Sequence, residues 1–117
     1  MKFPIMLSAA ALFGHATAFY GQMAATALSS NEGTTFQTIT LTDYNTGSTY
    51  SGMLWGGFNA CTTYECSVGF DETSAGGYTF TAKMWRTSDG CHNIDFLGAL
   101  DAGHGYCCGS LPCDFSA

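Results

Sequence analysis

The chain has little charge, and very little of that charge is positive. Its 117 residues include three Lys+Arg against nine Asp+Glu, which gives a net formal charge of −6. Disordered chains combine high charge with low hydrophobicity, whereas here 10% of residues are charged and 46% are hydrophobic. The scarcity of cations argues against a nucleic-acid partner, because a basic surface is needed to neutralise phosphates. The length favours one domain.

Long hydrophobic runs are also lacking. The apolar segment from Phe3 to Phe13 is shorter than the roughly 20 residues of a membrane helix, and no later segment is longer, so we expect no membrane span. Lys2 before this segment and Ala16-Thr17-Ala18 after it are typical of a secretory signal peptide. We therefore predict a signal peptide over residues 1–18 and a secreted, extracellular domain over 19–117. A second small-x-small triplet, Ala25-Thr26-Ala27, leaves a later cleavage or a short pro-segment open.

All of the cysteines lie outside the predicted signal peptide. The six cysteines are Cys61, Cys66, Cys91, Cys107, Cys108 and Cys113. An even number in a short secreted chain indicates a disulfide framework rather than a zinc site. A bridge between the adjacent Cys107 and Cys108 would be strained, and on a strand the two would point to opposite faces and reach different partners. The spacer Gly109–Pro112 is compatible with a turn, which favours a local Cys108–Cys113 bridge, although the other pairings stay open.

A helical period of apolar residues is absent as well. Strand-like segments begin near residues 34, 49, 63, 78, 93 and 105, and the clearest alternation of apolar and polar residues covers 64–70 and 78–85. Turn signals such as Asn45-Thr46-Gly47 and Thr87–Gly90 separate them. The pattern predicts an all-β fold, a small disulfide-stapled β-sandwich or barrel. An α+β fold, with one or two short helices at 19–30 or near 71–76, is the alternative.

Four titratable residues lie close together near the C-terminus: His92, Asp95, Asp101 and His104. A histidine oriented by a carboxylate is the minimum for acid–base catalysis, and this residue set also supplies nitrogen and oxygen ligands for zinc or manganese. Neither interpretation has a diagnostic spacing, and the same residues suit ordinary glycine-containing loops. We therefore assign no catalytic, metal or cofactor residue from the sequence.

Trp85 is the candidate contact residue. It alternates with the apolar positions of its strand and falls on the polar face with Thr81 and Lys83. An exposed tryptophan can stack on a sugar or anchor a protein partner, whereas a bulge at the strand end would turn it inward. The glycine-flanked Trp55 is expected in the core.

Two resemblances bear on function. Glu65 or Glu72, then Arg86, then His92 or His104 follow part of the residue order of the small secreted guanyl-preferring ribonucleases of fungi, but the first histidine of that order is missing from the predicted mature chain. The signal peptide, the short chain, the six cysteines and the segment Gly103–Gly109 resemble the small secreted cysteine-rich proteins of filamentous fungi, an effector-like and killer-toxin-like class.

The second resemblance favours a non-enzymatic protein that binds a host or cell-surface protein or glycan. We also expect a monomer with no cofactor. The low positive charge argues against the cationic antifungal members of that class. A small secreted hydrolase or ribonuclease using His92 or His104 with a carboxylate is the second hypothesis. A carbohydrate-binding module is the third.

Overall fold

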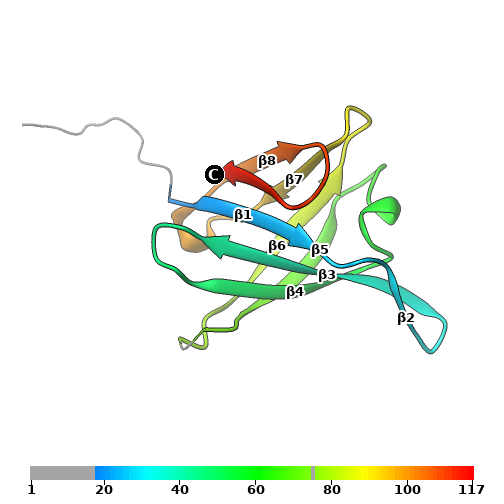
Figure 1. Ribbon diagram of the computed structural model, residues 1–117, viewed down its shortest axis with the longest axis horizontal. Coiled ribbons are helices and arrows are strands. Elements are labelled where there is room, and N and C mark those ends of the chain that lie inside the picture. The colour runs from blue at the N-terminus through cyan, green and yellow to red at the C-terminus, as the bar shows by residue number, and fades with distance from the viewer. Residues whose placement is uncertain (1–17, 75) are drawn as a thin grey trace, which may run out of the picture.

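Segments in which apolar and polar residues alternate form antiparallel strands in the computed structural model (Figure 1). The structure describes residues 18–74 and 76–117. Nearly all of the predicted signal peptide lies outside these residues. The strands are β1 (Tyr20–Ala25), β2 (Ser29–Asn31), β3 (Thr34–Asp43), β4 (Thr49–Trp55), β5 (Cys66–Glu72), β6 (Thr79–Arg86), β7 (Cys91–Asp95), β8 (His104–Cys108) and β9 (Cys113–Ser116). The all-β prediction is confirmed.

The α+β alternative is wrong for the described residues. Its helix at 19–30 is replaced by β1 and β2, and residues 66–72 continue as β5. Two single 3₁₀ turns, η1 (Phe58–Ala60) and η2 (Ala99–Asp101), are the helical elements of this part of the chain. Neither has the length or the apolar character to cross a bilayer.

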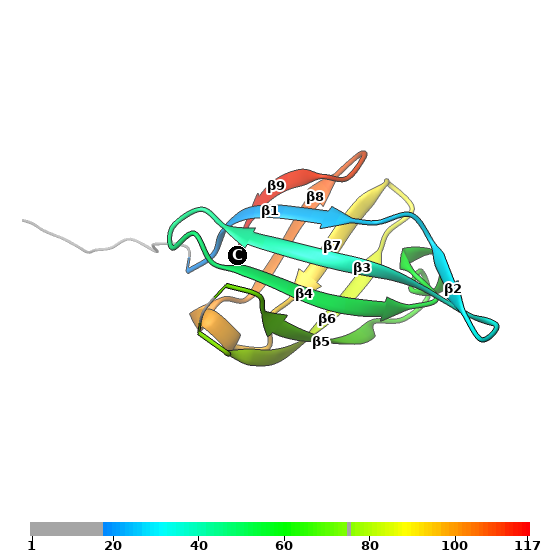
Figure 2. The same ribbon diagram turned by 60° about the horizontal axis from the view of Figure 1, so that its bottom comes forward.

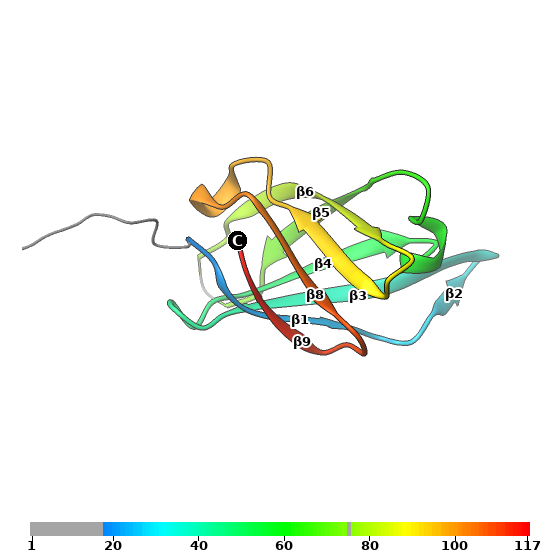
Figure 3. The same cartoon turned by 90° about the horizontal axis from the view of Figure 1, so that it is seen from above.

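The strands form one sheet in the order β8-β7-β6-β5-β4-β3-β1-β9, and β2 pairs only with β3. Neighbours in this order are antiparallel. The layer containing β1, β3 and β4 crosses over the layer containing β6, β7 and β8 (Figure 2). Strands β8 and β9 are the two ends of this order, and a tight turn joins them (Figure 3). The sheet is therefore a nearly closed barrel. The β2–β3 hairpin projects beyond it (Figures 1 and 2).

The apolar residues of each strand face the barrel interior. Alternation buries Val68 and Phe70 on β5 and Ala82 and Met84 on β6, as the sequence pattern predicts. The terminal segments contribute as well, because Phe19 stacks on Phe115 of β9 with ring centroids 5.0 Å apart. Other members of this core are Met23, Ile39, Leu41, Leu54, Ile94 and Phe96.

All six cysteines are paired, as Cys61–Cys66, Cys91–Cys108 and Cys107–Cys113. The prediction that the vicinal pair reaches two different partners is confirmed, but the predicted Cys108–Cys113 bridge is wrong. Alternation along β8 explains the difference, because Cys107 lies on the buried side, where Cys113 can reach it. Cys108 lies on the other side, directly opposite Cys91 on β7.

The expectation that Trp55 lies in the core is also wrong. Tyr50, Gly52 and Leu54 are the buried positions of β4, so alternation turns Trp55 outward and leaves it 53% exposed. It packs edge-to-face on Phe36, its partner across the β3–β4 ladder, with ring centroids 5.7 Å apart.

Candidate functional site

Two rows of polar and aromatic side chains cross the outer face of β6, β7 and β8. The cross-strand register aligns Trp85, Asn93 and Tyr106 in one row and Lys83, Asp95 and His104 in the next. Their neighbours in sequence, Met84 and Ile94, are fully buried on the inner face. The outer face of these strands is therefore where the candidate contact residue Trp85 lies.

Three aromatic rings on this face form a column. The His104 ring stacks on Trp85 with centroids 5.4 Å apart and planes 10° from parallel. It also stacks on Tyr106, with centroids 6.0 Å apart. A hydrogen bond of 2.9 Å between His104 Nε2 and Asn93 Oδ1 holds the imidazole in place. The column thus supports one side of the Trp85 indole and fixes its orientation.

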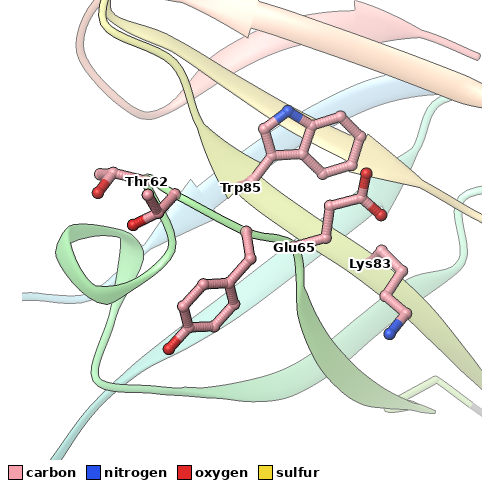
Figure 4. Close-up of a pocket in the computed structure, with 6 residues that line it drawn as sticks. Thr62, Glu65, Lys83 and Trp85 are labelled. Atoms are coloured by element: carbon pink, nitrogen blue, oxygen red, sulfur yellow. The ribbon is translucent and has the colours of Figure 1, made fainter.

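An open pocket of about 530 Å³ adjoins Trp85. Its lining residues are Thr62, Thr63, Tyr64, Glu65, Lys83 and Trp85. Because strand order places β8 on one side of β6 and the segment leading into β5 on the other, His104 and this pocket lie on opposite sides of Trp85. Figure 4 shows Glu65 between Trp85 and Lys83, with Thr62 farther along the rim. We call this hollow the Trp85 pocket.

The loop that forms the pocket wall is anchored at both ends. The Cys61–Cys66 disulfide closes the segment 62–65, and Cys61 itself is fully buried. The backbone N–H of Arg86 donates to the Cys61 carbonyl at 2.9 Å, and Arg86 Nη1 donates to Asn59 Oδ1 at 2.9 Å. A ligand would therefore meet a wall that is already in place, which lowers the entropy cost of binding.

The structure brings together only part of the predicted acid–base cluster. Asp95 and His104 are cross-strand partners on the outer face, whereas His92 lies on the other face of β7, with its ring 4.7 Å from that of Phe58. Asp95 also caps the following turn, since its carboxylate accepts the Leu97 N–H at 2.9 Å. Asp101 lies in η2, beyond the end of β7. The two histidines therefore do not share a site.

His92 is half-buried, and this burial lowers its pKa, with a smaller contribution from the nearby Arg86 charge. Its buried Nδ1 has no hydrogen-bond partner. A group in this environment favours the neutral imidazole.

Of the residues that follow the ribonuclease order, Arg86 and His92 are cross-strand partners, whereas Glu65 lines the Trp85 pocket. Glu72 lies beside the start of β6, where it accepts hydrogen bonds from the Ser74 hydroxyl and the Tyr78 N–H, while Arg86 ends β6. The Ser74 bond, followed by the Tyr78 bond, lowers the Glu72 pKa. Across residues 18–74 and 76–117, no three His, Cys, Asp or Glu side chains are arranged to hold a metal ion.

Two features of this surface were missed in the sequence. Tyr64, 69% exposed, is part of the Trp85 pocket, and its position in a short loop between two bonded cysteines is the signal that could have found it. The second is another open pocket, of about 310 Å³, lined by Thr38, Ser51, Gly52, Met53, Gly69 and Asp71. Extending the period of two through β4 would have predicted that Met53 and Trp55 face outward.

Comparisons of the chain with protein-family models, with curated protein sequences and with solved structures gave no match.

Proposed function

We propose that this chain is an extracellular, disulfide-stabilised binding protein without enzymatic activity, and that the Trp85 pocket is its contact surface. The observation that carries the proposal is the placement of Trp85. One side of its indole is supported by His104, and the other adjoins an open pocket whose wall is closed by a disulfide. Aromatic anchors held in this way contribute most to binding energy at interfaces.

The positions of the two histidines support binding over hydrolysis. Neither histidine lines the Trp85 pocket: His92 packs on Phe58 at the inner face, and His104 is held by Trp85 and Asn93. The lining of the Trp85 pocket combines one indole, one phenol, hydroxyls and a single pair of opposite charges. This composition is typical of a recognition site that orients a ligand through a few polar groups.

Trp85→Ala tests the proposal. We expect the labelled variant to bind insoluble polysaccharides and cell-surface preparations at least about tenfold more weakly than the wild type, because the variant lacks a central aromatic anchor. The control is Tyr20→Ala, which removes an exposed aromatic ring from β1, outside the Trp85 pocket, whereas Trp85 itself is half-buried. Both variants should keep the far-ultraviolet circular dichroism of the wild type.

Binding that is equally strong in wild type and Trp85→Ala would exclude the Trp85 pocket as the contact surface. Release of products from RNA or glycans by the wild-type protein, lost on substitution of His92 or His104, would replace the proposal with the hydrolase hypothesis.

A further inference from the structure

Both pockets open on the outside of the barrel, on either side of β5. The Trp85 pocket involves β6 and the segment entering β5, and the second pocket involves β3, β4 and β5. Strand β5 therefore runs between them, and its outward positions are Ser67, Gly69 and Asp71, all exposed.

The floor between the two pockets has almost no side chain. Gly69 lines the second pocket, and a Cβ atom added to it would meet no atom within 4 Å. Ser67, the next outward residue, is the cross-strand partner of Lys83 in the Trp85 pocket. Lys83 and Trp85 border this strip on β6, and Met53 borders it on β4. We call the strip from Trp85 across Ser67 and Gly69 to Met53 the β5 trough.

Strand geometry sets the length of the trough. Trp85 and Met53 lie two strands apart and, by the register, about four residues apart along the strands, which gives a diagonal of about 16 Å along the curved surface of the sheet. One monosaccharide ring cannot contact both ends of such a strip, whereas a linear oligomer can.

The chemistry of the trough favours a neutral sugar chain. An indole can pack on the C–H face of a pyranose, and Thr62, Ser51 and Asp71 offer hydroxyl and carboxylate groups to sugar hydroxyls. The acidic chain, with its net charge of −6, would repel a polyanionic glycan.

An extended peptide fits the trough less well. Peptides that add to a sheet obtain affinity from main-chain hydrogen bonds at a free edge. Strand β5 already pairs with β4 on one side and β6 on the other, so its backbone is occupied where the trough crosses it.

We propose that the ligand of this protein is a neutral linear oligosaccharide that crosses β5 diagonally, with one end on Trp85 and the other in the pocket beside Met53. This inference rests on the proposed function and specifies its ligand class. It adds that affinity depends on chain length, because only a longer oligomer reaches both pockets.

The experiment compares β-linked disaccharides and hexasaccharides of glucose and of N-acetylglucosamine by titration calorimetry. Wild type should bind a hexasaccharide at least about tenfold more tightly than the disaccharide, since the second pocket adds contacts without a second loss of rigid-body freedom. Gly69→Gln places a polar side chain in the trough and should reduce hexasaccharide affinity to that of the disaccharide, which stays unchanged. Gly103→Gln, at another open glycine outside the trough, is the matched control.

The outcomes separate this inference from the proposed function. Equal affinity for the two lengths, or no effect of Gly69→Gln, overturns the trough, even where Trp85→Ala still abolishes binding. Binding to a cell-surface preparation that is sensitive to Trp85→Ala and lost after protease treatment, with no affinity for either oligosaccharide series, overturns the glycan class and retains the Trp85 pocket. Absence of any binding sensitive to Trp85 overturns both.

Discussion

Protonation of the His92 side chain makes the stability of the barrel depend on pH. It packs on Phe58, lies near the Arg86 charge, and has a buried Nδ1 without a partner. Burial, followed by the Arg86 charge, lowers its pKa below the ordinary value of 6.5. As pH falls through 6.5, the unfolded chain binds a proton at this position before the folded chain does, so the free energy of unfolding decreases toward the lower, folded pKa.

We therefore predict that His92→Gln loses less stability than the wild type between pH 7 and pH 5. Urea unfolding at both values measures the difference. The carboxylates of Glu72 and Asp89 have pKa values lowered by hydrogen bonds to Ser74 and Thr87, and their contribution is lost only as pH falls below their ordinary values of 4.5 and 3.8. The chosen window thus lies above the range in which these two carboxylates lose their contribution, and the difference between the two proteins reports His92. Identical pH dependence in the two proteins would contradict the assignment.

Single residues also show what a period of two can and cannot predict. It predicts that Trp85 points outward, because the neighbouring apolar positions alternate clearly, but the glycines that flank Trp55 obscure the alternation there. It separated Cys107 from Cys108, yet the partner of each depends on which strand lies opposite. Strand pairing is a long-range property, which local spacing does not contain.

At the scale of elements, β8 and β9 are the two ends of the strand order, and the Cys107–Cys113 disulfide joins them. Close packing accompanies the bridge, because a Cβ atom on Gly105 of β8 would lie 2.5 Å from the Ser116 carbonyl oxygen. The other two bridges do not join the ends of the sheet. Cys91–Cys108 joins strands that are already paired, and Cys61–Cys66 closes the loop of the Trp85 pocket.

Replacing Cys107 and Cys113 together by alanine should lower the free energy of unfolding by about 2 kcal/mol through the loss of loop closure. It should also speed amide hydrogen exchange in β9, because the closure of the barrel is weakened. The control is the double alanine variant of Cys61 and Cys66, whose loop is of similar length, with a sequence separation of 5 against 6. Equal exchange in β9 for both double variants would show that the bridge does not hold the barrel closed.

Six strands begin close to where the sequence predicts them, because their apolar positions alternate between clear turn signals. Strands β1, β2 and β9 are not predicted from the sequence. Strand β1 is rich in alanine and glycine, and β9 has only four residues, so neither carries a strong local signal. Their strand conformation depends on mutual pairing and on β3, which packs Met23 and Phe115 into the core. The trough could not be predicted either, because it joins outward positions of strands whose register was unknown.

For the whole molecule, the two ends of the domain close the barrel against each other. Phe19 and Ala117 exchange both backbone hydrogen bonds, at 3.2 and 2.9 Å, and β1 pairs with β9 beside them. The Phe19 ring lies in a cluster with Phe96 and Phe115. This arrangement bears on the two cleavage sites that the sequence left open, because β1 lies between them.

We predict that the folded secreted chain begins at Phe19 and that a chain of residues 28–117 does not fold. Loss of β1 leaves β9 without its ladder partner and removes Phe19 and Met23 from the core. Truncation of one such side chain to alanine costs about 2–5 kcal/mol, so the combined loss approaches the roughly 5–15 kcal/mol by which domains are stable. Circular dichroism and thermal unfolding of the two chains test the folding. Mass spectrometry of the N-terminal peptide of the secreted protein identifies the cleavage site. Cooperative unfolding of 28–117 at the temperature of 19–117 would show that β1 is dispensable and that cleavage after Ala27 is compatible with the fold.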